Sequence, residues 1–236
     1  MGGKLEKLPW DSQWLGLPVA RYVADAGTMA EAQAAAKEAR EGGIRLLYLV
    51  MPPHSREEVS GIQALGARLL DEKLSYVMAL VAERPVELPH GLVLQKVKAP
   101  VSPLEELAIQ SGAYSRFRLD ARIGPAAFEA LYRRWLHQSV EKGDVWTIQS
   151  AGKELGLLAL GQRGTMLSIE LLAVAPPARR RRLGRLLVAC AAREARQQGL
   201  DGLQVVTQGA NEPARRLYES CGFELARTEY VYHWWL

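Results

Sequence analysis

The pattern of apolar and polar positions over residues 1–88 predicts a small unit in which helices and strands alternate. Two capping boxes, in each of which a glutamate follows a hydroxyl residue by three positions, predict helices that start after Thr28 and Ser55. Two apolar runs predict strands, a buried one at 44–51 and a second at 74–81. Because strands and helices alternate here, we expect a partly parallel sheet.

Residues 83–91 separate this unit from the rest of the chain. The segment contains Pro85 and Pro89 and has neither helical nor strand periodicity, which is typical of a linker. We therefore expect two domains, a small N-terminal α/β domain at 1–88 and a larger domain at 89–236.

The larger domain is predicted to contain both a sheet and helices. Three consecutive strands separated by glycine-containing turns indicate an antiparallel meander. The helix before the meander carries Phe128, Leu131, Trp135 and Leu136 at helical spacing, so we expect this face in the core. In chain order the predicted elements are a strand at 92–97, helices at 103–111 and 125–140, strands at 146–149, 155–160 and 166–174, a helix at 183–198, a strand at 203–207, a helix at 212–220 and two strands within 223–235.

The composition narrows the class of protein. Of the 236 residues, 48% are hydrophobic and 24% are charged, which excludes wholesale disorder. The apolar runs are too short to cross a bilayer, and the first residues do not read as a signal peptide. Two cysteines and four histidines favour neither a disulfide framework nor a metal site. We expect a cytoplasmic protein that binds no metal and no membrane.

One cluster of arginines accounts for the basic balance of the chain. There are 30 basic and 26 acidic residues, a net charge of +4, and five of the arginines lie within residues 179–185. Without those five, 25 basic residues remain against 26 acidic ones, a net charge of −1. This concentration argues against a nucleic-acid-binding surface and for a small anionic partner. A charge run exposed to solvent is the alternative.

The cluster lies where a helix is predicted to start, directly after a buried strand that ends at Val174. Free backbone N–H groups and the helix dipole make such a start a binding site for anions. Five arginines at that end oppose the dipole, a conflict that a bound polyanion would remove. We expect Gly184 to let the backbone approach a phosphate closely.

This stretch resembles the acetyl-CoA motif of the GCN5-related N-acetyltransferase (GNAT) superfamily. Val174, Pro176, Arg179 and Gly184 match the motif in register, whereas Arg182 stands where its first glycine usually lies. The resemblance implies that backbone amides of residues 180–185 hold the pyrophosphate of acetyl-CoA.

A second motif, at residues 211–223, is similar to a later motif of the same superfamily. Every named position is filled, by Asn211, Ala214, Leu217, Tyr218, Gly222 and Phe223. Two ordered motifs are more specific than one. The resemblance implies the acyl-CoA N-acyltransferase fold, a mixed and mostly antiparallel sheet flanked by helices. It also implies the cofactor-binding residues, which are Leu172, Ala173, Val174, Arg179, Arg180, Arg181, Arg182, Leu183, Gly184, Arg185, Asn211 and Tyr218.

The reaction implied by this resemblance is direct acetyl transfer from acetyl-CoA to an amine. Tyr218 is the expected acid for the departing thiolate, and a backbone N–H near Ala173 or Val174 is the expected oxyanion donor. Period-two alternation places Glu170 on the sheet face of Val174, which makes it the expected base. The alternative is a glutamate paired with an arginine. His137 and His233 are alternative bases, each expected on a helix or strand surface.

Further stretches resemble dTDP-fucosamine acetyltransferases. They are residues 8–12, 15–20, 115–120 and 128–135. The resemblance implies N-acetylation of a nucleotide-linked amino-deoxy sugar, as in polysaccharide biosynthesis, and a possible homodimer. Arg116 would pair with the nucleotide diphosphate, and Tyr114 or Phe117 would stack on a base or sugar.

Two other functions remain open from the sequence. An acetyltransferase acting on a peptide N-terminus or another small amine would share both motifs. A basic module that binds nucleic acid without catalysis would use the arginine cluster alone.

Overall fold

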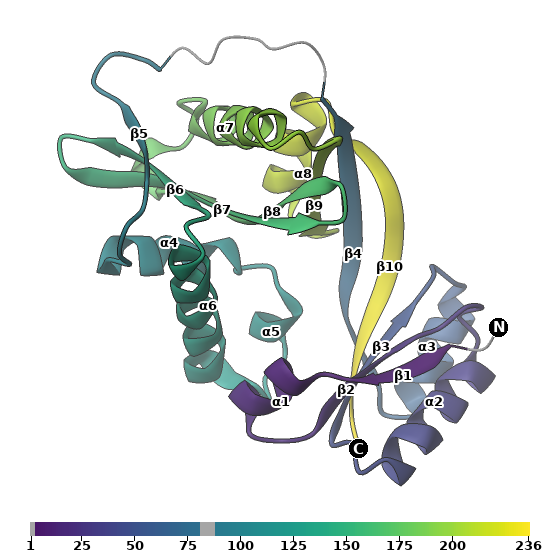
Figure 1. The fold of residues 1–236 in the computed structure, drawn as a ribbon. Coiled ribbons are helices and arrows are strands. Elements are labelled where there is room, and N and C mark those ends of the chain that lie inside the picture. Colours follow the sequence, from purple (N-terminus) through teal and green to yellow (C-terminus); the bar gives the residue numbers. More distant parts are fainter. Residues whose placement is uncertain (1–2, 81–87) are drawn as a thin grey trace.

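The protein is described by a computed structural model over residues 3–80 and 88–236, in which ten strands form one mixed sheet (Figure 1). The strand order is β1-β2-β3-β10-β4-β9-β8-β7-β6-β5. Only the pairs β2–β3 and β8–β9 are parallel among the described strands. The strands are β1 (Lys4–Lys7), β2 (Val19–Val23), β3 (Leu46–Met51), β4 (Arg68–Ala79), β5 (Val93–Lys96), β6 (Val145–Ser150), β7 (Lys153–Arg163), β8 (Met166–Val174), β9 (Gly202–Gln208) and β10 (Glu224–Trp235).

The helices of the N-terminal part start where the capping boxes predict them. Helix α2 (Met29–Glu41) is capped by Thr28, whose Oγ1 accepts from the N–H of Glu31 at 3.2 Å. Helix α3 (Arg56–Ala64) is capped by Ser55 in the same way. The parallel β2–β3 pair confirms the expected mixture of strand directions.

Three N-terminal elements have no counterpart in the pattern-based prediction. They are β1, the short helix α1 (Pro9–Leu15) and β2. Their sequences are short, and β1 contains one leucine among three charged residues. Neither the helical nor the strand periodicity therefore continues long enough to be recognised.

Strand β4 connects the two ends of the molecule. It pairs with β9 on one side and with β10 on the other, and in Figure 1 both β4 and β10 run from the part that contains α7 and α8 to the part that contains β3. Part of the N-terminal chain is therefore an inner strand of the same sheet that contains β5–β9. The expected linker falls largely outside the described residues, and its described part, 88–91, forms neither helix nor strand.

The prediction of two strands within 223–235 is wrong. The segment forms one strand, β10, which pairs with both β3 and β4. Its register against β4 shifts between Leu225 and Arg227 and again between Val231 and Tyr232. Because each shift interrupts the alternation of side chains, a single irregular strand imitates two.

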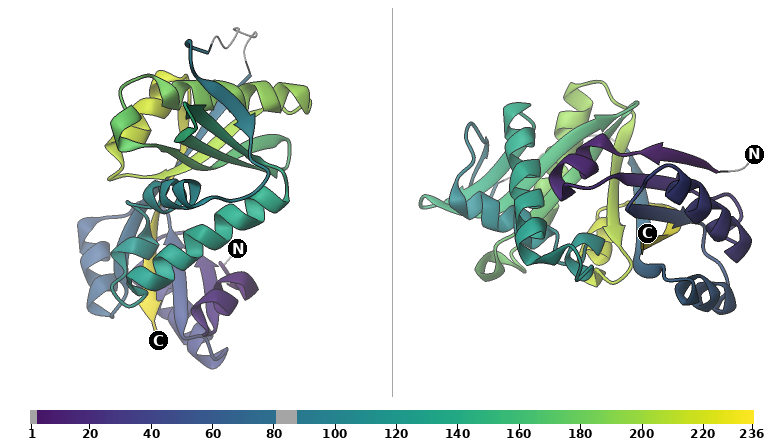
Figure 2. Two further views of the ribbon diagram at one scale, coloured as in Figure 1. Left: turned by 90° about the vertical axis from the view of Figure 1, so that its left-hand side faces the viewer. Right: turned by 90° about the horizontal axis from the view of Figure 1, so that it is seen from below.

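Helices cover both faces of the part of the sheet that contains β6–β9 (Figure 2). Helix α7 (Leu183–Gln197) and helix α8 (Glu212–Ser220) lie on one face, and helix α4 (Ser102–Ser111) and helix α6 (Gly124–Glu141) lie on the other. The β6–β7–β8 meander is antiparallel, as predicted. In the described residues, no helix combines the length and apolar character that crossing a membrane requires.

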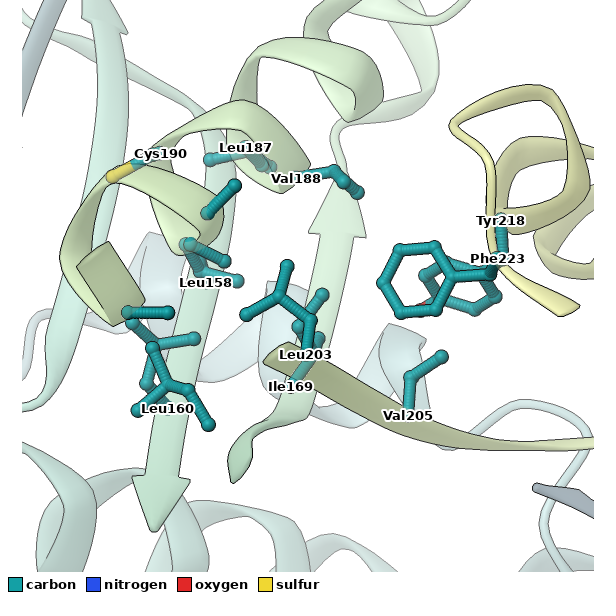
Figure 3. Packing of buried hydrophobic residues seen from close by; sticks show 14 of the residues in the cluster. Leu158, Leu160, Ile169, Leu187, Val188, Cys190, Leu203, Val205, Tyr218 and Phe223 are labelled. Carbon is teal, nitrogen blue, oxygen red and sulfur yellow. The ribbon is translucent and has the colours of Figure 1, made fainter. Parts of the chain in front are cut away.

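The core beneath α7 and α8 anchors the functional part of the chain (Figure 3). Leu158, Leu187 and Leu203 are fully buried there, and Tyr218 and Phe223 pack beside Val205 with their ring centres 5.5 Å apart. The strands, α7 and α8 thus share one apolar layer, which holds the start of each helix in place against the sheet.

Candidate active site

A cleft opens where the parallel strands β8 and β9 separate. Their pairing ends at Ile169 and Val205, and the residues beyond these positions line a cavity of about 1020 Å³. Besides β8 and β9, the lining comes from β4, from the segment 110–117, from α6, from residues 179–185 and from α8. Because β8 has no strand partner on this edge beyond Ile169, backbone groups there are left for a ligand.

A β-bulge changes the face on which Glu170 was expected. Ala159 of β7 pairs with Leu171 and Leu160 pairs with Ile169, so Glu170 is the extra residue. Val174 packs toward the α7 core, whereas the carboxylate of Glu170 contacts α6 on the other side. The expectation that Glu170 shares a face with Val174 is therefore wrong, because the bulge breaks the period-two alternation.

The Glu170 carboxylate is held at the cleft wall. Trp135 of α6 donates its Nε1–H to Oε2 at 3.1 Å, and the guanidinium of Arg163 lies 3.8 Å from Oε1. A Cβ added to Gly161 would lie 2.5 Å from Oε1, so glycine leaves room for the carboxylate. Glu170 lines the cleft and has an arginine beside it, as the alternative expectation has it, and its role as the base stays a prediction.

The first turn of α7 points unpaired backbone groups at the cleft. Arg182 is its N-cap, and the N–H groups of residues 183–185 have no acceptor within the helix. Arg182 has a φ of 62° and Arg180 a φ of 61°, the left-handed region that favours glycine. This conformation explains why a glycine would suit the position of Arg182. The Nε–H of Arg179 donates to the carbonyl of Val174 at 3.2 Å and ties this turn to β8.

Most of the predicted cofactor-binding residues meet in this cleft, with one exception. The lining includes Leu172, Ala173, Val174, Arg179, Arg180, Arg182, Leu183, Gly184, Arg185, Asn211 and Tyr218. Arg181 is exposed and is not part of the lining. Gly184 has a packing reason of its own, because an added Cβ would lie 3.0 Å from Cδ2 of Leu217 on α8. Glycine thereby allows the close contact of α7 with α8.

Asn211 and Tyr218 stand at the two ends of the α8 segment that borders the cleft. The Oδ1 of Asn211 caps α8 by accepting from the N–H of Ala214 at 3.3 Å, which leaves its Nδ2 amino group as a donor. Tyr218 is 5% exposed, and burial raises the pKa of its hydroxyl well above the usual range. A phenol in this setting stays protonated and can give a proton.

The opposite end of the cleft contains the residues expected to bind the acceptor. Tyr114, Arg116 and Phe117 all line it. Tyr114 is 39% exposed and free to stack, whereas Phe117 is half-buried and packs edge-on against Trp14 and Tyr48, with ring centres 5.8 and 6.2 Å away.

Two further cleft residues, Asp71 and Lys73, come from β4 and were missed in the sequence. Asp71 is 8% exposed, and its Oδ1 is buried with no hydrogen-bond partner in the described part of the chain. Burial raises the pKa of Asp71 to about 7, although the positive charges of Arg116 and Lys73 act the other way. The predicted strand began at residue 74, so these residues were not assigned to any element.

The two histidines considered as bases occupy different environments. His137 is on the surface of α6, as expected, and its Nε2 lies 2.7 Å from Oε1 of Glu105. His233 is 1% exposed, so the expectation of a surface position is wrong. It lies on β10 between the ring of Tyr48 and the carboxylate of Asp120, and it does not line the cleft.

The overall fold is shared with several solved structures. A conserved protein of unknown function from Staphylococcus epidermidis superposes with a TM-score of 0.68 at 13% identity, over 98% of this chain and 91% of that one. GCN5-related N-acetyltransferases from Sphaerobacter thermophilus and Kribbella flavida give TM-scores of 0.64 and 0.60, at 13% and 17% identity. They cover 98% and 99% of this chain and 76% and 87% of theirs. These likenesses confirm the expected fold.

The sequence itself identifies the family. No curated protein sequence gives a significant match. The family model described as "Acetyltransferase (GNAT) family" matches residues 105–223, half of the chain, and this range includes the bulged β8, the arginine cluster and α8. The chain therefore belongs to the GNAT family of acetyltransferases, enzymes that use acetyl-CoA as co-substrate.

Proposed function

We propose that this enzyme transfers the acetyl group of acetyl-CoA directly to the amino group of a nucleotide-linked amino-deoxy sugar. The observation that carries the proposal is a single cleft with a cationic helix start at one end, the Tyr218 hydroxyl along its wall, and Arg116 and Asp71 at the other end. The cleft thus has separate places for a phosphorylated donor and a charged acceptor.

The donor half of the cleft suits a pyrophosphate and an amide-containing arm. The free N–H groups of residues 183–185 bind the pyrophosphate, with Arg180, Arg182 and Arg185 beside them. The Nδ2 amino group of Asn211 donates to the pantetheine arm. Acetyl-CoA supplies the thioester whose acetyl group is transferred.

Three groups of this chain carry the proton transfers and the charge on the acetyl oxygen. Tyr218 gives its phenolic proton to the departing sulfur. The edge of β8 beyond Ile169, which has no strand partner, provides a backbone N–H for the oxyanion near Ala173 or Val174. A carboxylate at the acceptor end receives the proton that the amine loses.

Asp71 is the carboxylate best suited to that role. Its free, buried Oδ1 and a pKa of about 7 match a group that takes up a proton near neutral pH. Glu170 is the second candidate, because a bulge and Gly161 place its carboxylate in the cleft wall. The Trp135 and Arg163 contacts of Glu170 make it more suited to orienting the amine than to releasing and taking up protons.

The acceptor end favours an amine that carries an anion and a ring. Arg116 supplies positive charge there, whereas the ammonium of Lys73 is paired with Glu229 at 2.9 Å, and the exposed ring of Tyr114 offers a stacking surface. Together with the resemblance of residues 8–12, 15–20, 115–120 and 128–135 to dTDP-fucosamine acetyltransferases, this supports a nucleotide-linked amino sugar. Four of the five arginines of the cluster line the cleft of an acetyltransferase, so a nucleic-acid-binding module without catalysis is the poorer explanation.

The test is a screen of amine acceptors with release of the free thiol of CoA as readout. The panel contains dTDP-linked and UDP-linked amino sugars, the same amino sugars without nucleotide, and peptides with free N-termini. We expect turnover of a nucleotide-linked amino sugar and little with the sugar alone. Turnover of peptides or simple amines only would overturn the acceptor assignment and favour the alternative GNAT activity.

A further inference from the structure

A buried polar network lies behind the acceptor end of the cleft. Its centre is Asp120, which is 1% exposed and follows the short helix α5 (Arg116–Leu119). One carboxylate oxygen accepts from Nδ1–H of His233 at 2.7 Å and from Nε1–H of Trp235 at 2.9 Å, and the other accepts from the N–H of Arg122 at 3.1 Å. These three donors hold Asp120 as an anion in one orientation.

Asp120 in turn determines the state of His233. Because Asp120 accepts from Nδ1, that nitrogen carries the proton and Nε2 is left as an acceptor. Burial lowers the pKa of His233 to about 4, so the ring stays neutral near pH 7. The Nε–H of Arg116 donates to Nε2 at 3.1 Å. A neutral histidine thus connects a buried carboxylate with an arginine.

Arg116 is the member of this network that reaches the cleft. Its guanidinium lies 4.6 Å from the ring centre of Tyr48 and 4.1 Å from that of Phe117, and the ring of Tyr48 is stacked on His233 at 4.7 Å. Asp120, His233 and Tyr48 are not part of the lining, whereas Arg116 is. In the described residues the guanidinium of Arg116 forms no direct salt bridge, although its positive charge acts on the carboxylates of Asp71 and Asp11. Its Nε–H is used by His233, so the terminal nitrogens are the donors that a ligand can reach.

We propose that His233 and Asp120 are positioning residues that hold Arg116 ready to bind an anionic group of the acceptor, a phosphate or a carboxylate, at the far end of the cleft. The proposal rests on the proposed function and deepens it, because it assigns the anion-binding contact to one residue and its orientation to two others. An arginine fixed at Nε and between rings loses little conformational freedom when a planar or tetrahedral anion binds to its terminal nitrogens.

The test compares variants that keep or remove a hydrogen-bond acceptor for the Nε–H of Arg116. His233→Phe keeps an aromatic ring on Tyr48 and removes the acceptor, whereas His233→Gln offers an amide oxygen near the place of Nε2. Trp235→Phe is the matched control, because it removes a hydrogen bond to the same Asp120 oxygen and leaves the Arg116–His233 contact untouched. Thermal unfolding of all three shows how much stability each loses.

The binding readout uses dTDP as probe, added to enzyme saturated with CoA so that the arginine cluster is occupied. By calorimetry we expect His233→Phe and Arg116→Lys to weaken dTDP binding about tenfold or more, and His233→Gln and Trp235→Phe to weaken it about threefold or less. With a nucleotide-linked amino sugar, His233→Phe raises the acceptor KM and leaves kcat and the KM for acetyl-CoA nearly unchanged. With the same amino sugar lacking the nucleotide, the variant and the wild type behave alike.

Three results would overturn the proposal. They are the absence of dTDP binding by the wild type, equal losses in His233→Phe and Trp235→Phe, and a fall in kcat without a change in acceptor KM. The proposed function fails separately, if the wild type acetylates no nucleotide-linked amino sugar while the dTDP binding pattern of the variants holds.

Discussion

The indole Nε1–H of Trp135 donates a hydrogen bond to Oε2 of Glu170 over 3.1 Å and so joins helix α6 to the bulge in β8. The second oxygen of Glu170 faces the guanidinium of Arg163 at 3.8 Å. The side chain of Glu170 is about one-fifth exposed (21%), so the contacts act at the edge of the cleft, where solvent only partly screens them. The carboxylate is therefore oriented before any acceptor arrives.

Replacing Trp135 with phenylalanine tests this orientation. The ring remains but the donor is lost, and a hydrogen bond to a charged group is worth about 1.5–3 kcal/mol. We expect kcat/KM to fall about tenfold with a small loss in Tm. Trp10→Phe is the control, because its Nε1–H also bonds to a residue of α6, Gln138, and Trp10 lies outside the cleft. Equal effects of the two substitutions would show that Trp135 acts through the stability of α6 alone.

Tyr218→Phe tests the acid. The pKa of the hydroxyl is raised by burial, so the phenol is protonated across the working range and its loss removes a proton donor. We expect kcat to fall about 10²–10⁴-fold, the usual contribution of a positioned acid, while the KM for acetyl-CoA changes little. The measurement is steady-state kinetics with both substrates varied.

Tyr76→Phe is the matched control for Tyr218. Tyr76 is buried, its ring centre lies 6.4 Å from that of Tyr218, and its hydroxyl donates to Glu219 outside the cleft. Removing this hydroxyl costs stability and leaves kcat nearly unchanged. An unaltered kcat in Tyr218→Phe would instead assign the proton donor to another group.

The sequence predicts which residues line the proposed donor half of the cleft, because each motif is local. The strand that ends at Val174, the turn and α7 are continuous in the chain, and so are the cap at Asn211 and helix α8 that follows it. Backbone geometry over a few residues is enough to bring these groups to one edge of the sheet.

The proposed acceptor half depends on contacts between distant parts of the chain. Asp71 reaches the cleft because β4 inserts between β9 and β10, a pairing of segments more than 100 residues apart. The bulge at Glu170 is visible only in the register between β7 and β8. His233 is buried because β10 packs against α5. The sequence of β10 alone contains no pattern from which this contact could be predicted.

Asp71→Asn tests the proton acceptor through pH. The usual pKa of an aspartate is about 3.9, and that of Asp71 is raised to about 7, so the folded state binds more protons than the unfolded state between these values. The contribution of Asp71 to stability therefore falls as pH rises from about 4 to 7.

We expect the free energy of unfolding of Asp71→Asn to exceed that of the wild type at pH 8 by roughly 1–4 kcal/mol. This difference should shrink as the pH falls toward 4. The rise of kcat/KM with an apparent pKa near 7 should disappear in the variant. Tm and kcat/KM are measured from pH 5 to 9. Glu72→Gln, at the exposed neighbouring position, removes a negative charge that helps to raise the pKa of Asp71, so both profiles should shift slightly to lower pH without disappearing. A wild-type profile retained in Asp71→Asn would transfer the role to Glu170.

Arg182→Gly tests whether backbone amides or the arginine side chain dominate anion binding at the start of α7. Arg182 has a φ of 62°, and the left-handed region costs a residue other than glycine roughly 1 kcal/mol, so we expect Tm to rise by about 2–4 °C. If the N–H groups of residues 183–185 dominate, calorimetry should find CoA affinity within about threefold of the wild type.

Arg181→Gly is the control. It removes the same charge from a residue that lies outside the cleft and whose φ is not in the left-handed region, so it should lower Tm slightly without changing CoA affinity. A tenfold or greater loss of CoA affinity in Arg182→Gly alone would assign the pyrophosphate contact to the guanidinium, and the departure from glycine at this position would then serve binding rather than only being tolerated by the fold.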